Sequence, residues 1–164
     1  MERDSYLDGI RSAWLGERYG EKFFAALAAR SADPALASKW LRLAELEHVT
    51  GQRMADLLAT YGETVNEDEP ISLGDDIIAQ YADVPHAEAM QQMRDVVETA
   101  IVHFDQLLAV APEDDVPAVH FLVQHEQALL EFVDVELAED GRDSLRATQA
   151  LLGAVVGDDS TTGP

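Results

Sequence analysis

Three glutamates, Glu17, Glu47 and Glu126, lie where apolar residues recur every three or four positions along the chain. This recurrence is typical of a helix that turns one face toward a core, so each carboxyl group is expected to point inward. An unpaired buried carboxylate is costly and needs protons, hydrogen-bond donors, buried water or metal ions to compensate it. Divalent metal ions bind carboxylate oxygens readily, and each ion cancels two charges. The pattern therefore predicts a carboxylate-rich metal site, with a protonated, water-bridged cluster as the alternative.

Glu21 and His125 are the further candidate metal ligands. At about 100° per residue, Glu21 projects roughly 40° away from Glu17 on the same helix. His125 stands next to Glu126, at the edge of that glutamate's apolar stripe. Reorientation of its ring, or a rotation of the helix, would bring the imidazole into the site.

A Glu-x-x-His string is also present, at Glu45 and His48. The helical phase, however, argues against a role for both residues in one buried site. Glu45 projects about 160° from Glu47 and is expected to face solvent. We therefore expect Glu47, rather than Glu45, to reach the interior.

The three inward glutamates also agree in height. Glu17 and Glu47 are each 15 residues from Ala32, which lies in a predicted turn, so they are level if the two helices form an antiparallel pair. Glu126 lies 13 residues after Glu113, near the middle of its own helix. The carboxyl groups are thus expected at mid-depth of one bundle.

The helical periodicity predicts long helices over residues 5–29, 35–61, 86–111 and 116–139, and a shorter amphipathic helix over 144–155 across the end of the bundle. Residues 1–156 are expected to form one domain, and 157–164 a disordered tail. The third long helix carries no carboxylate on its apolar stripe. Glu98 has a suitable height there but lies about 100° off the stripe, so its contribution stays open.

The lengths of the connections predict the topology. Short turns follow the first and third long helices, which makes each consecutive pair an antiparallel hairpin. The connection of residues 63–85 is long enough to cross the full length of a bundle. Two hairpins joined by a long crossover are expected, and an up-and-down bundle with an overgrown middle loop is the competing topology.

Composition restricts the class of function. The chain has 164 residues, no cysteine and a formal net charge of −21. The absence of cysteine excludes disulfides and thiolate metal sites. The negative charge argues against binding to nucleic acid or to anionic membranes. No apolar run is long enough for a membrane span and the N-terminal residues lack a signal pattern, so a cytoplasmic location is expected.

Taken together, residues 5–139 resemble the ferritin-like superfamily, in particular the rubrerythrin and di-iron carboxylate proteins. That family places a Glu on the first and third helices and Glu-x-x-His on the second and fourth. By position, Glu17 (or Glu21), Glu47 and Glu126 match the carboxylates of the first, second and fourth helices. Thr50 and Leu129 stand where the family has histidines, so the ligand set is degenerate.

The resemblance implies a ferritin-like metal-binding protein that holds one or two metal ions, iron or manganese, among Glu17, Glu21, Glu47, Glu126 and His125. With a redox-active metal it would be an oxidoreductase that uses dioxygen or peroxide. Relatives in this superfamily commonly self-associate, which makes a homo-oligomer a further expectation.

Two other functions are consistent with the residues. The first is a non-catalytic bundle that has lost its metal and acts as a structural or binding module. The second is a small-molecule enzyme that uses the glutamates for proton transfer, which requires an accessible cavity and raised carboxyl pKa values. The sequence indicates neither a substrate nor the identity of the metal.

Overall fold

The structure is a computed structural model that describes residues 2–159, with the side chains of residues 4–157. The described chain consists of α1 (Glu2–Arg30), α2 (Pro34–Thr60), α3 (Asp75–Ala82), α4 (His86–Ala109), the 3-10 helix η1 (Glu113–Asp115), α5 (Val116–Ala138) and α6 (Arg146–Asp159). These residues include no strand, which confirms the predicted all-α fold. The four predicted long helices correspond to α1, α2, α4 and α5. None of the described helices combines the length and hydropathy that a bilayer crossing requires.

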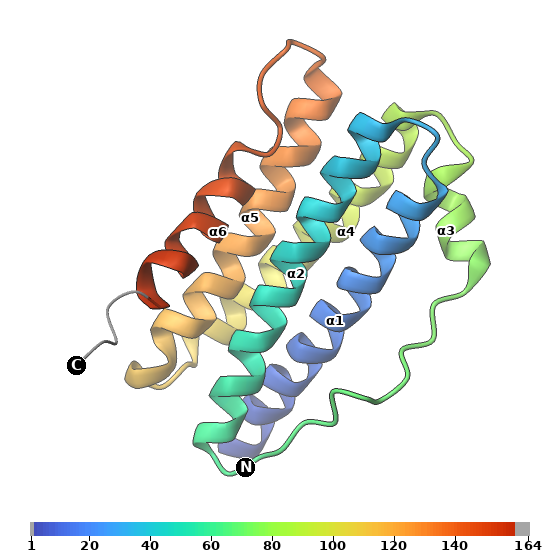
Figure 1. The fold of residues 1–164 in the computed structure, drawn as a ribbon. Helices are drawn as coiled ribbons and strands as arrows, with labels where there is room; N and C mark the ends of the chain where they lie inside the picture. Colours follow the sequence, from blue (N-terminus) through green and yellow to red (C-terminus); the bar gives the residue numbers. More distant parts are fainter. Residues whose placement is uncertain (1, 160–164) are drawn as a thin grey trace.

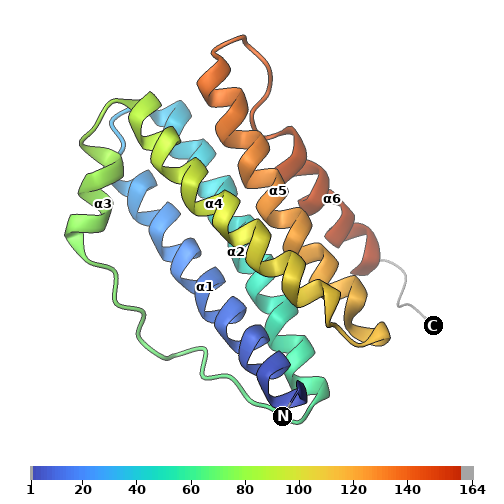
Figure 2. The same cartoon turned by 180° about the vertical axis from the view of Figure 1, so that it is seen from behind.

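The helices form two antiparallel hairpins, α1 with α2 and α4 with α5 (Figure 1). Between the hairpins, the chain after α2 runs along the outside of the bundle to its opposite end, where α3 lies (Figures 1 and 2). As a result α2 and α4 run in the same direction. The predicted crossover is therefore present, and its second half is the helix α3.

Hydrogen bonds from side chains fix the start of α2 and the position of the crossover. At the start of α2, Asp33 Oδ1 accepts a hydrogen bond of 2.9 Å from the Ala35 N–H, and Pro34 occupies the first turn. Arg18 of α1 donates hydrogen bonds of 2.7 Å to the carbonyls of Glu67 and Glu69 in the crossover. These bonds tie the extended segment to the side of α1.

The C-terminal helix differs from its predicted position. Instead of crossing the end of the bundle, α6 lies along its side against α5 and α2 (Figure 1). Its Leu152 packs with Leu46 of α2 and with Phe121 and Ala128 of α5. The helix continues to Asp159, so residues 157–159 of the predicted tail are helical, whereas residues 160–164 lie outside the described part.

The apolar core has two halves along the bundle axis. One half lies at the end that holds the α1–α2 turn and contains Phe24, Trp40 and Phe132. The other lies toward the opposite end and contains Ile10 and Met54, among others. In α1, α2 and α5 the polar residues that were predicted to point inward lie between the two halves.

A partly buried ion network fixes the end of the bundle near the α1–α2 turn. Glu136 of α5 accepts a bond of 2.5 Å from Lys39 of α2, and its other oxygen lies 2.8 Å from Nε2 of His86 at the start of α4. The hydrogen bond with His86, aided by Lys39, outweighs the effect of burial and lowers the pKa of Glu136 to about 2.

We predict that Glu136→Gln destabilises the protein by about 1–3 kcal/mol at pH 7, because the charged carboxylate is held by two donors. A depressed carboxyl pKa contributes stability above the ordinary value near 4.5 and loses it as the pH falls toward 2. Urea unfolding should therefore show a difference between wild type and variant that shrinks between pH 5 and pH 2. Exposed Glu69→Gln is the control, and a difference that does not change with pH would contradict the prediction.

Candidate metal centre

The hairpin of α1 and α2 brings Glu17 and Glu47 to the same height in the interior. Glu17 is 2% exposed and Glu47 is 5% exposed, which agrees with the phase of their apolar stripes. Two glycines allow the helices to carry these carboxyl groups between them. A Cβ atom at Gly20 would lie 2.3 Å from Glu47 Oε2, and one at Gly51 would lie 3.2 Å from Glu17 Cβ.

The helix α5 adds His125 and Glu126 to the same layer. Glu126 is 7% exposed and His125 is fully buried. His125 shares a face of α5 with Phe121 and Ala128, the residues that pack under α6. His125 therefore reaches the site from the edge of the stripe, on a face of α5 that α6 and α2 cover.

His125 stands between the two carboxyl groups of the α1–α2 hairpin. Its Nε2 is hydrogen-bonded to Glu47 Oε1 at 3.2 Å. Its Nδ1 lies 3.2 Å from Glu17 Oε2, but the pair lacks hydrogen-bond alignment, so both atoms are buried without a hydrogen-bond partner. One ligand atom each from Glu17, His125 and Glu126 lie within 4.8 Å of one another. An ion bound among these three residues would satisfy the two unpaired atoms.

The electrostatics of the layer favour a cation. Burial, then the charges of Glu47 and Glu126, raise the pKa of Glu17 well above its ordinary value. Burial also raises the pKa of Glu126 to about 7, although His125 opposes the shift. For His125, burial lowers the pKa, but Glu47 and Glu126 outweigh it and raise the pKa overall. The site therefore holds protons where a metal ion would supply positive charge.

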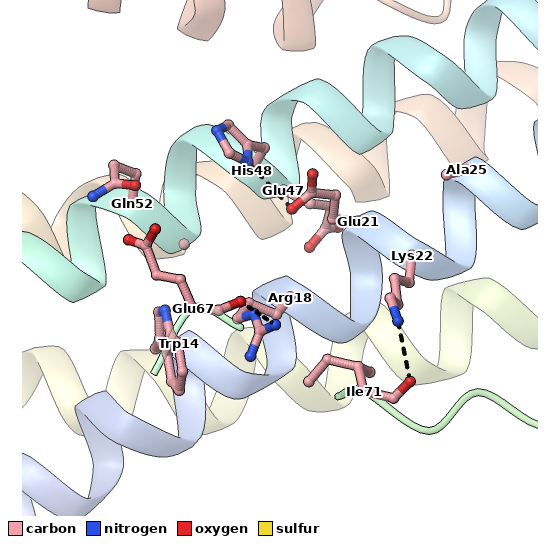
Figure 3. Close-up of a pocket in the computed structure, with 11 residues that line it drawn as sticks. Trp14, Arg18, Glu21, Lys22, Ala25, Glu47, His48, Gln52, Glu67 and Ile71 are labelled. Atoms are coloured by element: carbon pink, nitrogen blue, oxygen red, sulfur yellow. Dashed lines mark hydrogen bonds and ion pairs between the residues drawn. The ribbon is translucent and has the colours of Figure 1, made fainter. Parts of the chain in front are cut away.

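The structure does not bring Glu21 into this layer. Its carboxylate lies outside, 3.2 Å from Nδ1 of His48, and both side chains are largely exposed. Figure 3 shows the two residues in a surface cleft between α1 and α2, with Glu47 on its inner side. The angle of about 40° between Glu17 and Glu21 around the helix axis is enough to place one carboxyl inside and the other outside.

Two other residues considered from the sequence have structural roles. Thr50, at the position of a family histidine, is fully buried and donates its hydroxyl to the Leu46 carbonyl at 2.8 Å. Glu98 faces solvent on α4 and pairs with Arg94 at 3.1 Å. Among the described residues, α4 therefore places no carboxylate beside His125.

A pocket of about 370 Å³ reaches the buried layer between α1 and α4, with α3 at one side. Glu17, Glu47 and Glu126 line it together with apolar and aromatic side chains. This pocket and the close approach at Gly20 were not predicted. The signal for the glycine is its spacing, since Gly20 follows Glu17 by three residues and Gly51 follows Glu47 by four, on the paired faces.

Comparisons of the chain with protein-family models, with curated proteins and with solved structures found no match. The donor set described above consists of three carboxyl groups and one imidazole, drawn from α1, α2 and α5. Oxygen and imidazole donors in this ratio are suited to manganese, iron or zinc in their divalent states.

We predict that Gly20→Ala displaces the Glu47 carboxylate without unfolding the chain. The new methyl would occupy the space of Glu47 Oε2, while alanine gains about 0.5–1 kcal/mol over glycine in a helix interior. The ring nitrogen signals of His125 in NMR spectra should change because the hydrogen bond to Glu47 is lost. Gly16→Ala is the matched control on α1, since nothing lies within 4 Å of its Cβ position. Identical His125 signals in both variants would contradict the close approach.

We also predict that Glu17→Gln stabilises the metal-free protein by about 1–3 kcal/mol at pH 8, because it removes a buried charge that lacks compensation. A raised carboxyl pKa favours folding below the ordinary value and loses that contribution as the pH rises, so the gain should be smallest at pH 4–5. Urea unfolding in chelator measures it. Glu21→Gln, one turn along on the exposed side, should not show this pH-dependent gain.

Proposed function

We propose that this chain is a ferritin-like metal-binding protein that holds a divalent ion through Glu17, His125 and Glu126, with Glu47 beside them. The observation that supports this most directly is the pair of unpaired buried atoms, Glu17 Oε2 and His125 Nδ1, in a layer with Glu126. A buried layer of this composition is otherwise difficult to reconcile with stability.

The topology supports the ferritin-like part of the proposal. Two antiparallel hairpins joined by a long crossover are the arrangement of that superfamily, whose metal ligands project inward from the middle of the helices. The family's dinuclear pattern uses ligands from all four helices. Here the described residues of α4 contribute none, which favours one ion over two.

Each side chain has a definable part in the proposed site. In the proposed site Glu47 would accept a hydrogen bond from Nε2–H of His125, so that Nδ1 of the neutral ring would be the nitrogen that binds the metal. Glu17 and Glu126 supply the negative charge. Binding of a cation releases the protons that these groups hold in its absence. If the ion is iron or manganese, it would supply redox chemistry with dioxygen or peroxide.

Metal binding is tested by elemental analysis of protein purified without chelator, followed by titration with zinc, manganese and ferrous iron. We expect about one equivalent of tightly bound metal, as the ligand set holds one ion. Glu126→Gln and His125→Gln should weaken binding at least tenfold, since each removes a donor. Exposed Glu45→Gln controls for cations attracted to the acidic surface.

The proposed metal-binding function and a non-catalytic bundle that has lost its metal predict different outcomes of this experiment. A bundle that has lost its metal would bind cations equally in wild type, Glu126→Gln and Glu45→Gln, because only the surface would then attract them. That result would refute the proposed metal site. Selective loss in the two site variants would exclude the metal-free alternative.

A further inference from the structure

The pocket between α1 and α4 has apolar walls and an acidic floor. Its walls include the rings of Phe23 and Phe104 and the aliphatic side chains of Val97 and Leu129. Its floor is made of the three buried glutamates. A volume of about 370 Å³ falls at the lower end of the range for small-molecule sites, roughly 300–1,000 Å³.

The pocket is open to solvent on one side. Tyr19 is 37% exposed and Val96 is 60% exposed, and both line it, as does the exposed Gly16. Gly16 and Tyr19 belong to α1, and Val96 belongs to α4. Figure 2 shows the course of these two helices. The lining of the pocket therefore extends from exposed residues of α1 and α4 to the three buried glutamates.

The short helix α3 closes one side of the pocket. Its Tyr81 and Ile77 line the wall, and the ring of Tyr81 packs edge-on against Phe23 with centroids 4.9 Å apart. The crossover thus contributes to the binding space as well as connecting the hairpins. Aromatic rings on two sides favour a flat apolar body, or a cation above a ring face.

The side chains in the pocket lining that can carry a full charge at neutral pH are all carboxyl groups. In the described residues its lining includes no lysine, arginine or histidine, whereas Glu17, Glu47 and Glu126 all contribute. An anionic ligand would find no cationic partner in this lining, and a fully apolar one would leave the carboxyl groups without a donor. A ligand with an apolar body and one cationic donor satisfies both the walls and the floor.

We infer that this pocket binds a small apolar amine, about one aromatic ring in size, with its ammonium group directed at Glu17 and its neighbouring carboxyl groups. The inference goes beyond the proposed metal function, because the amine is a second kind of occupant for the same acidic floor. The amine and a metal ion would compete for the glutamates, since both neutralise them.

The test uses metal-free wild-type protein in chelator and three probes of equal size: benzylamine, benzyl alcohol and benzoate. Calorimetric titration should show benzylamine binding at least tenfold more tightly than benzyl alcohol, and no detectable binding of benzoate. The methyl signals of Met93 and Ala100 in NMR spectra should shift with benzylamine, because both residues line the pocket. Equal binding of the amine and the alcohol, or unmoved methyl signals, would overturn the inference.

A matched pair of variants on α4 separates the pocket from the acidic surface. Ala100→Phe places a ring into the pocket and should weaken benzylamine binding at least tenfold. Val102→Phe, at a position that is 59% exposed on the same helix, should leave it unchanged. An equal loss of benzylamine affinity in both variants would contradict binding in the pocket. If Ala100→Phe fails to fold, the shifts of the Met93 and Ala100 methyl signals in the wild type provide the test instead.

The variants distinguish a failure of this inference from a failure of the proposed metal site. Ala100 is not a proposed ligand, so zinc binding by Ala100→Phe should match the wild type even when benzylamine is excluded. Amine binding without zinc binding would refute the proposed function alone, and zinc binding without amine binding would refute this inference alone.

Discussion

The arrangement of this bundle depends on the burial of three carboxyl groups and one imidazole in a single layer between two apolar halves of the core. Like charges at this separation cannot all be ionised in a dry interior, so the layer must bind protons, a metal ion or an organic cation. The hydrogen bond between His125 and Glu47 provides part of the compensation. The unpaired atoms of Glu17 and His125 indicate that it is incomplete within the protein itself.

The backbone around the layer is adapted to this burial. Because Gly20 has no side chain, Glu47 can lie across α1 and reach His125. Gly51 has the corresponding position on α2, opposite the Cβ of Glu17. The pair allows two helices to approach closely at the height where each also inserts a long acidic side chain. Both glycines weaken their helices by about 0.5–1 kcal/mol relative to alanine, which the packing of long hairpins can tolerate.

Glu47 lies at the boundary between two different environments. On one side it meets the surface cleft in which Glu21 and His48 pair, and on the other it meets the apolar pocket between α1 and α4. Glu47 thus borders both a polar cleft and an apolar pocket. The crossover contributes to both, since Glu67 and Ile71 line the cleft and α3 lines the pocket. A connection of this length serves as a wall for two cavities as well as a link.

The sequence by itself determined the helices, the connection lengths and the inward direction of Glu17, Glu47 and Glu126, because helical phase and turn chemistry are local properties. Only the tertiary structure decided which residues at the edges of the stripes are buried. Glu21 lies outside, where it pairs with His48 at the surface, whereas His125 lies inside because α6 covers a second face of α5. The pocket likewise depends on the spacing of α1 and α4 and on the position of α3. Periodicity fixes directions within one helix, but the width of a buried face is set by how many neighbours pack against it.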